Sequence, residues 1–243
     1  MKRHSPAKNL TAFTLVELLV VISIIVILMS LLLTAVPAVK ESSRKLEARN
    51  MAGTVVNAAN AYYTEYAKFP SVLSPSEAKA NPPSNTEDTI VGDKDAMSAD
   101  LPNNTVFNTL RAINKGVNDN NLLNPRKVVF MEGKAAIVSA NNKARAGFFD
   151  RTQSGSAPPE NEDGCLYDPW GYQYGVVLDT TGDERIDLTN YYTDFTGANP
   201  TSGKAPRKRA GCFAVGKDGT LGKKGNNTYK TGTEASDDVI SWE

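Results

Sequence analysis

The feature that most constrains this chain is an apolar run near its N-terminus. Residues 15–36 contain one charged side chain, Glu17, and their other polar side chains are Ser23, Ser30 and Thr34. A bilayer core about 30 Å thick is crossed by roughly 20 helical residues, so the run is long enough to span a membrane. We therefore expect a membrane helix here.

An N-terminal apolar run is found in secretory signal peptides, in plain membrane anchors and in precursors that are cut before the run. A secretory signal peptide has an apolar region of about 7–15 residues before an AxA-like cleavage site, whereas this run is longer and lacks such a site. A plain anchor fits the length and the basic residues Lys2, Arg3 and Lys8 before it, which would stay in the cytoplasm. It does not explain Glu17, because a charge costs ~2.5–3.5 kcal/mol at the bilayer centre and usually has a partner.

Cleavage before Phe13 would give Glu17 that partner. The new α-amino group would lie one helical turn from the Glu17 carboxylate. The amine belongs either to the same chain or to a neighbour in an assembly. A neighbour's amine would neutralise both charges and set the axial stagger between subunits.

The segment Ala12-Phe13-Thr14-Leu15-Val16-Glu17 resembles the processing signal of type IV prepilins and pseudopilins. The resemblance implies cleavage between Ala12 and Phe13 by a prepilin peptidase and N-methylation of Phe13. It also implies self-assembly of the processed chains, with Glu17 as the acidic assembly residue. Most members carry glycine before the cut; because alanine is also small, we expect processing to proceed.

Beyond Pro37 the apolar pattern becomes amphipathic. One stripe recurs at spacings of three and four, which indicates a helix packed on a core: Ala48, Ala52, Val55, Ala59, Tyr62, Tyr66 and Phe69. Pro70 is expected to end this helix. The resemblance likewise implies one long helix from Phe13 to about Phe69, half in lipid and half under a soluble domain.

The middle of the chain carries weaker patterns. Residues 70–104 are rich in polar residues and proline, which predicts a surface excursion with a short helix near 76–80. A helix is expected over 105–115. Strands at 128–130 and 135–138 are expected to form a hairpin across Glu132-Gly133.

In the C-terminal part, a turn at Asp168-Pro169-Trp170-Gly171 precedes a predicted strand over 172–178, and further strands are expected at 212–215 and 239–242. This turn, together with the segments 213–219 and 237–242, resembles the major pseudopilin of type II secretion systems. The expected fold is α+β: a long N-terminal helix, with a transmembrane half and an amphipathic half, packed on a small C-terminal antiparallel β-sheet. The expected segments are a leader (1–12), membrane helix (13–36), amphipathic helix (37–69), variable region (70–162) and C-terminal β module (163–243).

In that family a calcium ion holds the loop between the last strands. Carried onto this chain, the resemblance implies as ligands the carbonyls of Val215 and Thr220 and the carboxylates of Asp218, Asp237 and Asp238. Calcium takes 6–8 oxygen ligands, which suits this set. The alternative is a solvated acidic turn. The loop is longer and more basic than the family pattern, so the choice between Asp237 and Asp238 stays open.

A second, weaker calcium candidate resembles the front of an EF-hand loop. Its oxygen ligands would come from Asp179, Thr181, Asp183 and Asp187. Against it, Glu184 stands where the motif has glycine, and Asn190 replaces the final glutamate. A polar hairpin tip is the alternative.

Composition argues against several classes of function. The single histidine, His4, lies in the leader, so the processed chain would lack the commonest general base, and we expect no enzyme. Cys165 and Cys212 are far apart with no CxxC motif, and they form either one disulfide or two buried thiols. Loss of the three leader cations leaves acids in slight excess, so nucleic-acid binding is not expected.

The sequence therefore predicts a pseudopilin that polymerises into a periplasmic pseudopilus driving type II secretion. It would cross the inner membrane once, with a cytoplasmic N-terminus and a periplasmic C-terminal domain. Its expected partners are its own copies, a prepilin peptidase, other pseudopilins and inner-membrane secretion components. The alternatives are a type IV pilin, which serves adhesion, motility or DNA uptake, and a monomeric anchored calcium-binding receptor.

Overall fold

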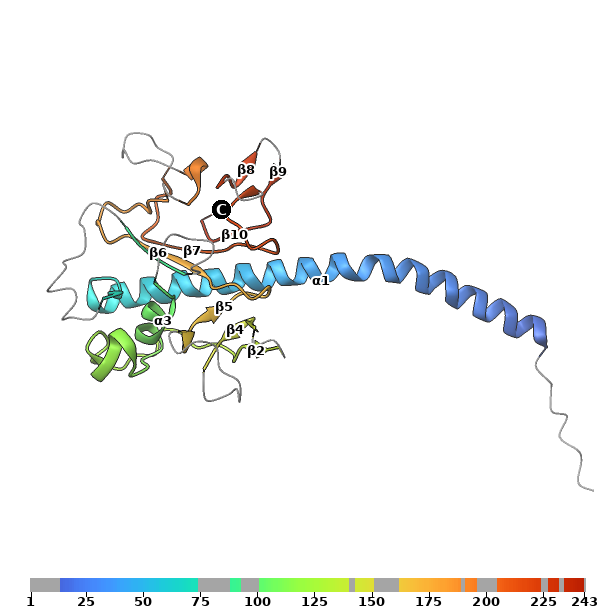
Figure 1. The fold of residues 1–243 in the computed structure, drawn as a ribbon, viewed down its shortest axis with the longest axis horizontal. Helices are drawn as coiled ribbons and strands as arrows, with labels where there is room; N and C mark the ends of the chain where they lie inside the picture. The colour runs from blue at the N-terminus through green and yellow to red at the C-terminus, as the bar shows by residue number, and fades with distance from the viewer. Residues whose placement is uncertain are drawn as a thin grey trace, which may run out of the picture. The chain divides into compact units, whose positions relative to one another are not determined.

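A computed structural model describes residues 14–73, 88–92, 101–139, 143–150, 162–188, 191–195, 205–223, 227–231 and 234–242. The chain forms two compact units, Met1–Ser43 and Arg44–Glu243, and helix α1 (Leu15–Tyr66) begins in the first and ends in the second (Figure 1). The predicted leader, with Ala12 and Phe13, lies outside the described residues.

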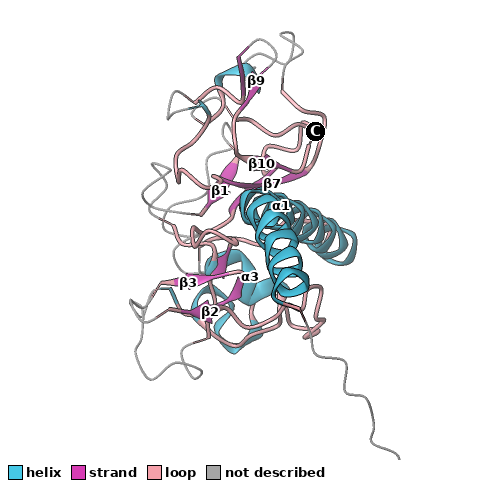
Figure 2. Cartoon of the chain, turned by 90° about the vertical axis from the view of Figure 1, so that its right-hand side faces the viewer, coloured by secondary structure: helices cyan, strands magenta, loops and turns pink. Residues whose placement is uncertain are grey.

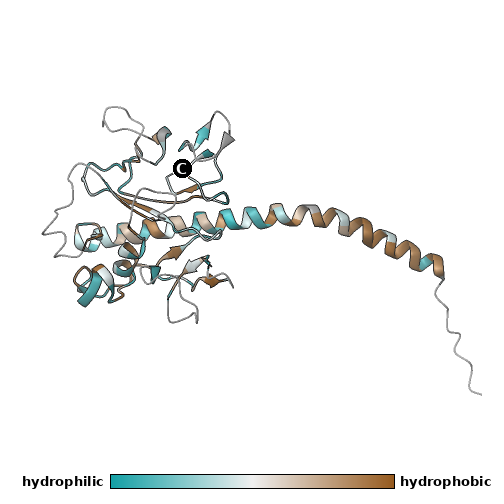
Figure 3. Ribbon diagram, viewed as in Figure 1, coloured by the Kyte–Doolittle hydropathy of each residue, from teal (hydrophilic) through white to brown (hydrophobic). Residues whose placement is uncertain are grey.

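The described residues of the first unit, 14–43, belong to the N-terminal part of α1 and include its apolar run. Its large apolar side chains are exposed along the whole run; Leu15 and Leu33, for example, are 79% and 80% exposed. Figure 3 shows this half of α1 as the hydrophobic one. Among the described helices, α1 is the one long and apolar enough to cross a membrane. Pro37 lies inside α1, so the helix continues past the residue that ends the apolar run.

In the second unit, α1 packs on a four-stranded antiparallel sheet in the order β1-β6-β7-β10 (Figure 2). The strands are β1 (Thr89–Val91), β6 (Gly175–Leu178), β7 (Ala210–Ala214) and β10 (Val239–Ile240). The predicted stripe is confirmed: Ala48, Ala52, Val55, Ala59, Tyr62 and Phe69 are buried, and Tyr66 is half-buried. The expected α+β fold is therefore confirmed.

The sheet is buried on both faces. Alternate residues of a strand point to opposite faces, and Cys212 packs in the core beneath α1 whereas Phe213 packs in a second core on the other face. Val176 and Val177 divide between the two cores in the same way. The predicted strands 172–178 and 239–242 correspond to the shorter β6 and β10. The predicted strand 212–215 corresponds to β7, which begins two residues earlier and ends one residue earlier.

Short elements complete the second unit. They are α3 (Asn104–Leu110), the 3₁₀ segments η1 (Gly116–Asn121) and η4 (Thr193–Phe195), and the antiparallel pairs β2 (Ile137–Val138) with β3 (Ala144–Arg145), β4 (Gly147–Phe148) with β5 (Leu166–Tyr167), and β8 (Lys230–Thr231) with β9 (Glu234–Ala235). The predicted helix over 105–115 is thus confirmed in its first part.

The predicted hairpin of 128–130 with 135–138 is wrong. Residues 128–130 form no strand; instead the Phe130 ring packs edge-on against Tyr62 and Tyr66 of α1, and its N–H donates to the Leu110 carbonyl. Residues 137–138 pair with β3. Packing an aromatic ring onto the end of α1 therefore replaces the expected strand pairing.

The predicted surface excursion over 70–104 is wrong in part. It contains β1, an edge strand of the main sheet, and the fully buried Asn103. The short helix predicted near 76–80 lies outside the described residues. A strand of three residues is too short to show a period in the sequence, which explains why it was missed.

Asn103 joins two elements that are distant in sequence. Its side-chain N–H groups donate to the carbonyls of Leu166 (2.9 Å) and Tyr174 (3.0 Å), and its Oδ1 accepts from the Leu166 N–H (3.0 Å). Its own backbone N–H donates to Gln173 Oε1 (3.1 Å). The Asn103 side chain thus satisfies backbone groups of β5 and of the residue before β6.

Substitution Asn103→Ala is expected to lower the free energy of unfolding by about 3 kcal/mol, because each buried backbone group left without a partner costs ~1–3 kcal/mol. The melting temperature of the full chain in detergent should fall by roughly 6–12 °C. Asn50→Ala is the control, since Asn50 is exposed on α1. Equal melting temperatures for the two variants would contradict the structural role of Asn103.

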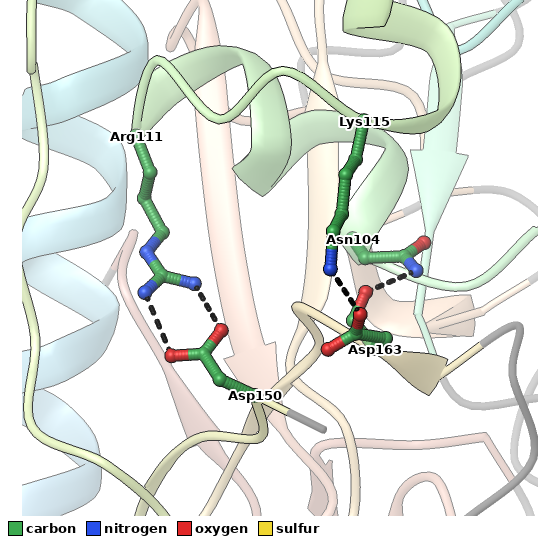
Figure 4. A network of polar contacts seen from close by, with 5 residues as sticks. All are labelled: Asn104, Arg111, Lys115, Asp150 and Asp163. Atoms are coloured by element: carbon green, nitrogen blue, oxygen red, sulfur yellow. Dashed lines mark hydrogen bonds and ion pairs between the residues drawn. The ribbon is translucent and has the colours of Figure 1, made fainter. Parts of the chain in front are cut away.

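A polar network joins α3 and the residues that follow it to Asp150 and Asp163 (Figure 4). Arg111 donates from both terminal nitrogens to Asp150 (3.2 and 3.1 Å), and its guanidinium lies 3.9 Å from the centre of the Phe148 ring. Lys115 pairs with the Asp163 carboxylate at 2.6 Å, and Asn104 donates to the Asp163 carbonyl. These contacts fix the position of β4 and β5 beneath α3.

Candidate functional site

The start of α1 carries the described part of the N-terminal motif. Glu17 Oε2 accepts from the Thr14 N–H (2.9 Å) and from the Thr14 hydroxyl (2.8 Å), and the Glu17 N–H donates to Thr14 Oγ1 (3.2 Å). This reciprocal pairing is a capping box, which satisfies N–H groups at the start of a helix. The Thr-x-x-Glu spacing predicts it, and it gives the Glu17 carboxylate a local partner within the single chain.

Three of the predicted calcium ligands lie together. One carboxylate oxygen each from Asp218, Asp237 and Asp238 lies within 4.8 Å of the other two. The topology explains this: Asp218 lies in the turn after β7, Asp237 and Asp238 immediately precede β10, and β7 pairs with β10 through Ala214 and Val239. The structure thus brings together carboxylates about twenty residues apart in sequence.

Hydrogen bonds hold one oxygen of each carboxylate. Asp237 Oδ2 accepts from the N–H groups of Lys217 (2.6 Å) and Asp218 (3.2 Å), and Asp218 Oδ1 accepts from the Thr220 N–H (2.9 Å). Asp238 Oδ2 accepts from the Tyr192 hydroxyl (2.7 Å) and the Gly222 N–H (2.8 Å). Asp238 Oδ1 is buried and has no hydrogen-bond partner within the described residues.

The turn around the cluster requires glycine at one position that touches a ligand. Gly216 has a φ of +74°, a conformation that side chains with a Cβ rarely adopt. A Cβ at Gly216 would lie 2.7 Å from Asp237 Oδ2 and 2.8 Å from the Asp237 carbonyl oxygen. The backbone therefore approaches Asp237 more closely than another residue would permit.

The electrostatics of the cluster favour a cation. Burial, together with the nearby charge of Asp237, raises the pKa of Asp238 to about 7, against the opposing effect of its hydrogen bonds. No lysine or arginine within the described ranges forms a salt bridge with Asp218, Asp237 or Asp238. Because an unpaired buried carboxylate is costly, and all the available ligands are oxygens, this arrangement fits a hard divalent cation. Val215 and Thr220 lie in the same segment, and their carbonyls remain predicted ligands.

The second calcium candidate is a polar turn that follows β6. Asp179 Oδ1 accepts from the Gly182 N–H (2.6 Å) and the Thr181 hydroxyl (3.2 Å), and its Oδ2 accepts from the Glu184 N–H (2.9 Å). The Asp183 carboxylate accepts from the Arg185 N–H. Among the described residues, these acids do not gather as closely as the group at Asp218. A second calcium site here stays a prediction.

Asp88 binds the turn that follows β6, and the sequence did not predict this contact. Its carboxylate accepts from the Thr181 hydroxyl (3.1 Å) and from the Asp187 N–H (2.7 Å). Burial raises its pKa, as does the neighbouring charge of Asp179, while these hydrogen bonds lower it. The Asp187 backbone, not its carboxylate, is thus the group that binds Asp88.

The two cysteines are free, buried thiols, so the disulfide alternative is not what the structure contains. Cys212 lies in the core beneath α1, whereas Cys165 packs in a separate cluster with Phe149 and Tyr167. Burial raises the pKa of both thiols, which keeps them protonated and unreactive.

Residues 8–33 match the family model described as the prokaryotic N-terminal methylation motif. The comparison with curated proteins yields no match, and neither does the comparison with solved structures. The match supports the type IV prepilin and pseudopilin family in general. It implies processing by a prepilin peptidase and assembly into a pilus-like polymer, and together with the apolar part of α1 it is consistent with a membrane anchor.

Proposed function

We propose that this chain is the major pseudopilin of a type II secretion system, a subunit that polymerises into a periplasmic pseudopilus. The observation that carries the proposal is the cluster of Asp218, Asp237 and Asp238, with its buried, unpartnered Asp238 oxygen. It lies on the loop where the resemblance to that family implies calcium. The N-terminal motif supports the coarser function, a membrane-anchored filament subunit.

In the proposed mechanism, the two units of the chain have separate tasks. The apolar part of α1 would anchor the precursor in the inner membrane with its N-terminus in the cytoplasm, and would later form the filament core. The second unit would lie in the periplasm and form the filament surface. Calcium, when bound, would supply positive charge to the three carboxylates and so hold the turn after β7 against the start of β10.

The alternative function is that of a type IV pilin. A cysteine-bounded loop near the C-terminus would favour a pilin; residues 165–212 are bounded by two cysteines but lie away from the C-terminus, and both thiols are free and buried. Other pseudopilins and inner-membrane secretion components are the partners that the secretion function requires.

The test of processing is co-expression of the full chain with a prepilin peptidase, followed by mass analysis of its N-terminus. We expect a product that begins at N-methylated Phe13. Ala12→Gly is the matched control and should give the same product, since both residues are small. An intact Met1, or a cut beyond residue 36, would contradict the proposed function.

Calcium binding is expected to weaken as the pH falls below about 7, the pKa of Asp238 in the metal-free fold. Between the ordinary pKa of 3.8 and this value, the folded state holds a proton that the unfolded state has lost, so the metal-free fold loses stability as the pH rises. Calcium must displace that proton. The apparent dissociation constant should therefore rise up to about tenfold for each pH unit below 7.

Calorimetric titration of the full chain at about pH 7.5 and pH 5.5 measures this dependence. Burial also raises the pKa of Asp168, to about 6, so Asp168 titrates in the same range. Asp168 lies in the turn before β6, and the dependence should persist in Asp168→Asn. Equal calcium affinity at both pH values would show that Asp238 is not a ligand.

A further inference from the structure

Tyr192 connects the acidic cluster to the second core. It is fully buried, and its ring packs edge-on against an aromatic group formed by Phe195, Phe213, Tyr229 and Trp242, with ring centres 5.4–6.4 Å away. Its hydroxyl donates to Asp238 Oδ2 at 2.7 Å. The phenol therefore meets both needs of a buried tyrosine, an apolar environment for the ring and an acceptor for the O–H.

This contact decides which Asp238 oxygen is available. The Tyr192 hydroxyl and the Gly222 N–H both bind Oδ2, and they approach from segments that are far apart in sequence. Oδ1 is left buried and without a partner within the described residues. With one oxygen held by two donors, the carboxylate has one orientation, and Oδ1 is the atom left to act as a ligand.

The segment 191–195, which carries Tyr192, is also hydrogen-bonded to residues 229–230. Asp194, two residues later, accepts from the N–H groups of Tyr229 (2.9 Å) and Lys230 (2.7 Å). The segment 191–195 thus binds Asp238 through a side chain and residues 229–230 through their backbone. Because the segment 191–195 contacts both, it can fix the position of the Tyr192 hydroxyl relative to the Asp238 carboxylate.

We propose that Tyr192 is the positioning residue of the metal site, whose hydroxyl holds Asp238 so that Oδ1 is a ligand, and that it couples metal binding to the aromatic group around Trp242. Partners that orient a ligand from outside typically change metal affinity 10–100-fold when removed. The inference rests on the proposed calcium site and adds to it a residue that does not touch the ion.

Calorimetric titration of the full chain in detergent with calcium chloride tests the positioning role. Tyr192→Phe removes one hydroxyl and keeps the ring, and we expect its calcium dissociation constant to rise about 10–100-fold. Tyr191→Phe is the matched control: Tyr191 is buried in the same core, and its hydroxyl makes no hydrogen bond among the described residues. The control should bind calcium like the wild type.

The outcomes separate the two proposals. Absence of calcium binding in the wild type overturns the proposed metal site. Wild-type binding with equal affinities for Tyr192→Phe and Tyr191→Phe overturns the positioning role and leaves the site intact.

A second measurement does not depend on the folding of Tyr192→Phe. The chain contains two tryptophans, so Trp170→Phe leaves Trp242 as its only one. Trp242 packs 6.1 Å from Tyr192, ring centre to ring centre. In this background, calcium should change the fluorescence emission of Trp242, with a midpoint at the calorimetric dissociation constant. An unchanged emission at saturating calcium overturns the coupling.

Discussion

Replacing Glu17 by glutamine is expected to abolish filament assembly while the chain is still inserted in the membrane and processed. In an assembly, the carboxylate would meet the α-amino group freed at Phe13 of a neighbouring chain, in surroundings with little water. Removing one partner of a buried ion pair costs about 3–5 kcal/mol, which is roughly a 10²- to 4 × 10³-fold loss in affinity at each subunit contact. Filaments sheared from cells and counted by electron microscopy should disappear.

The control for this prediction is Thr14→Ala. In the single chain, Glu17 caps α1 through Thr14, and the loss of a helix cap costs only ~1 kcal/mol. Thr14→Ala removes the hydroxyl of the capping box and keeps the charge, so filaments should persist in reduced number. If both variants lose filaments equally, the role of Glu17 is capping. If Glu17→Gln assembles normally, the alternative of a monomeric receptor gains support.

The long elements were predictable because periodicity in the sequence reports burial directly. Ala48 to Tyr62 repeat at helical spacing, and the residues of that stripe are the ones buried under the sheet. The sequence did not predict which strand residues lie on each face of the sheet. Residues 212–215 form a continuous apolar run, because both faces of the sheet are covered here. Such a run identifies a strand but does not show which of its residues faces α1.

Short and irregular elements were not predictable, because tertiary contacts determine them. Gly147 adopts a φ of +153°, and a Cβ there would lie 2.5 Å from the Lys134 carbonyl oxygen. This close approach sets the path of residues 134–136 beside β4, where Ala135 bridges Phe148. The predicted hairpin of 128–130 with 135–138 does not form, because residues 134–136 pack beside β4 instead. Nothing in the sequence near Gly133 reports a partner so far along the chain.

The candidate metal site also has a part that was predicted from the sequence and a part that was not. The grouping of Asp218 with Asp237 and Asp238 was expected from the resemblance to the pseudopilin family, and the pairing of β7 with β10 brings these residues together. The role of Tyr192 was not expected, since it lies 46 residues before Asp238 and follows a segment with no strand or helix pattern. A signal does exist in the chemistry: a buried carboxylate needs donors, and aromatic residues are frequent near 191–195.

Asp238→Asn is expected to abolish stabilisation by calcium. At a calcium concentration of about 100 times the dissociation constant, a single site adds about 2.7 kcal/mol to the free energy of unfolding. For a domain of this size, that raises the melting temperature by roughly 5–10 °C. Asp238→Asn removes the buried ligand charge, so the melting temperature of the full chain in detergent should become the same with calcium as with a chelator.

The metal-free state should respond in the opposite direction. Above pH 7 the wild-type chain without calcium carries an ionised, buried Asp238 with one oxygen unpartnered, which costs stability. Asparagine removes that charge and keeps an oxygen that can accept from Tyr192 and Gly222, so the melting temperature of the variant in chelator should equal or exceed that of the wild type.

The control is Asp183→Asn, because Asp183 is exposed and its carboxylate accepts from the N–H of its own turn. It should keep the full calcium shift. A calcium shift that survives in Asp238→Asn would place the ion elsewhere, or show that calcium acts on the chain without a specific site.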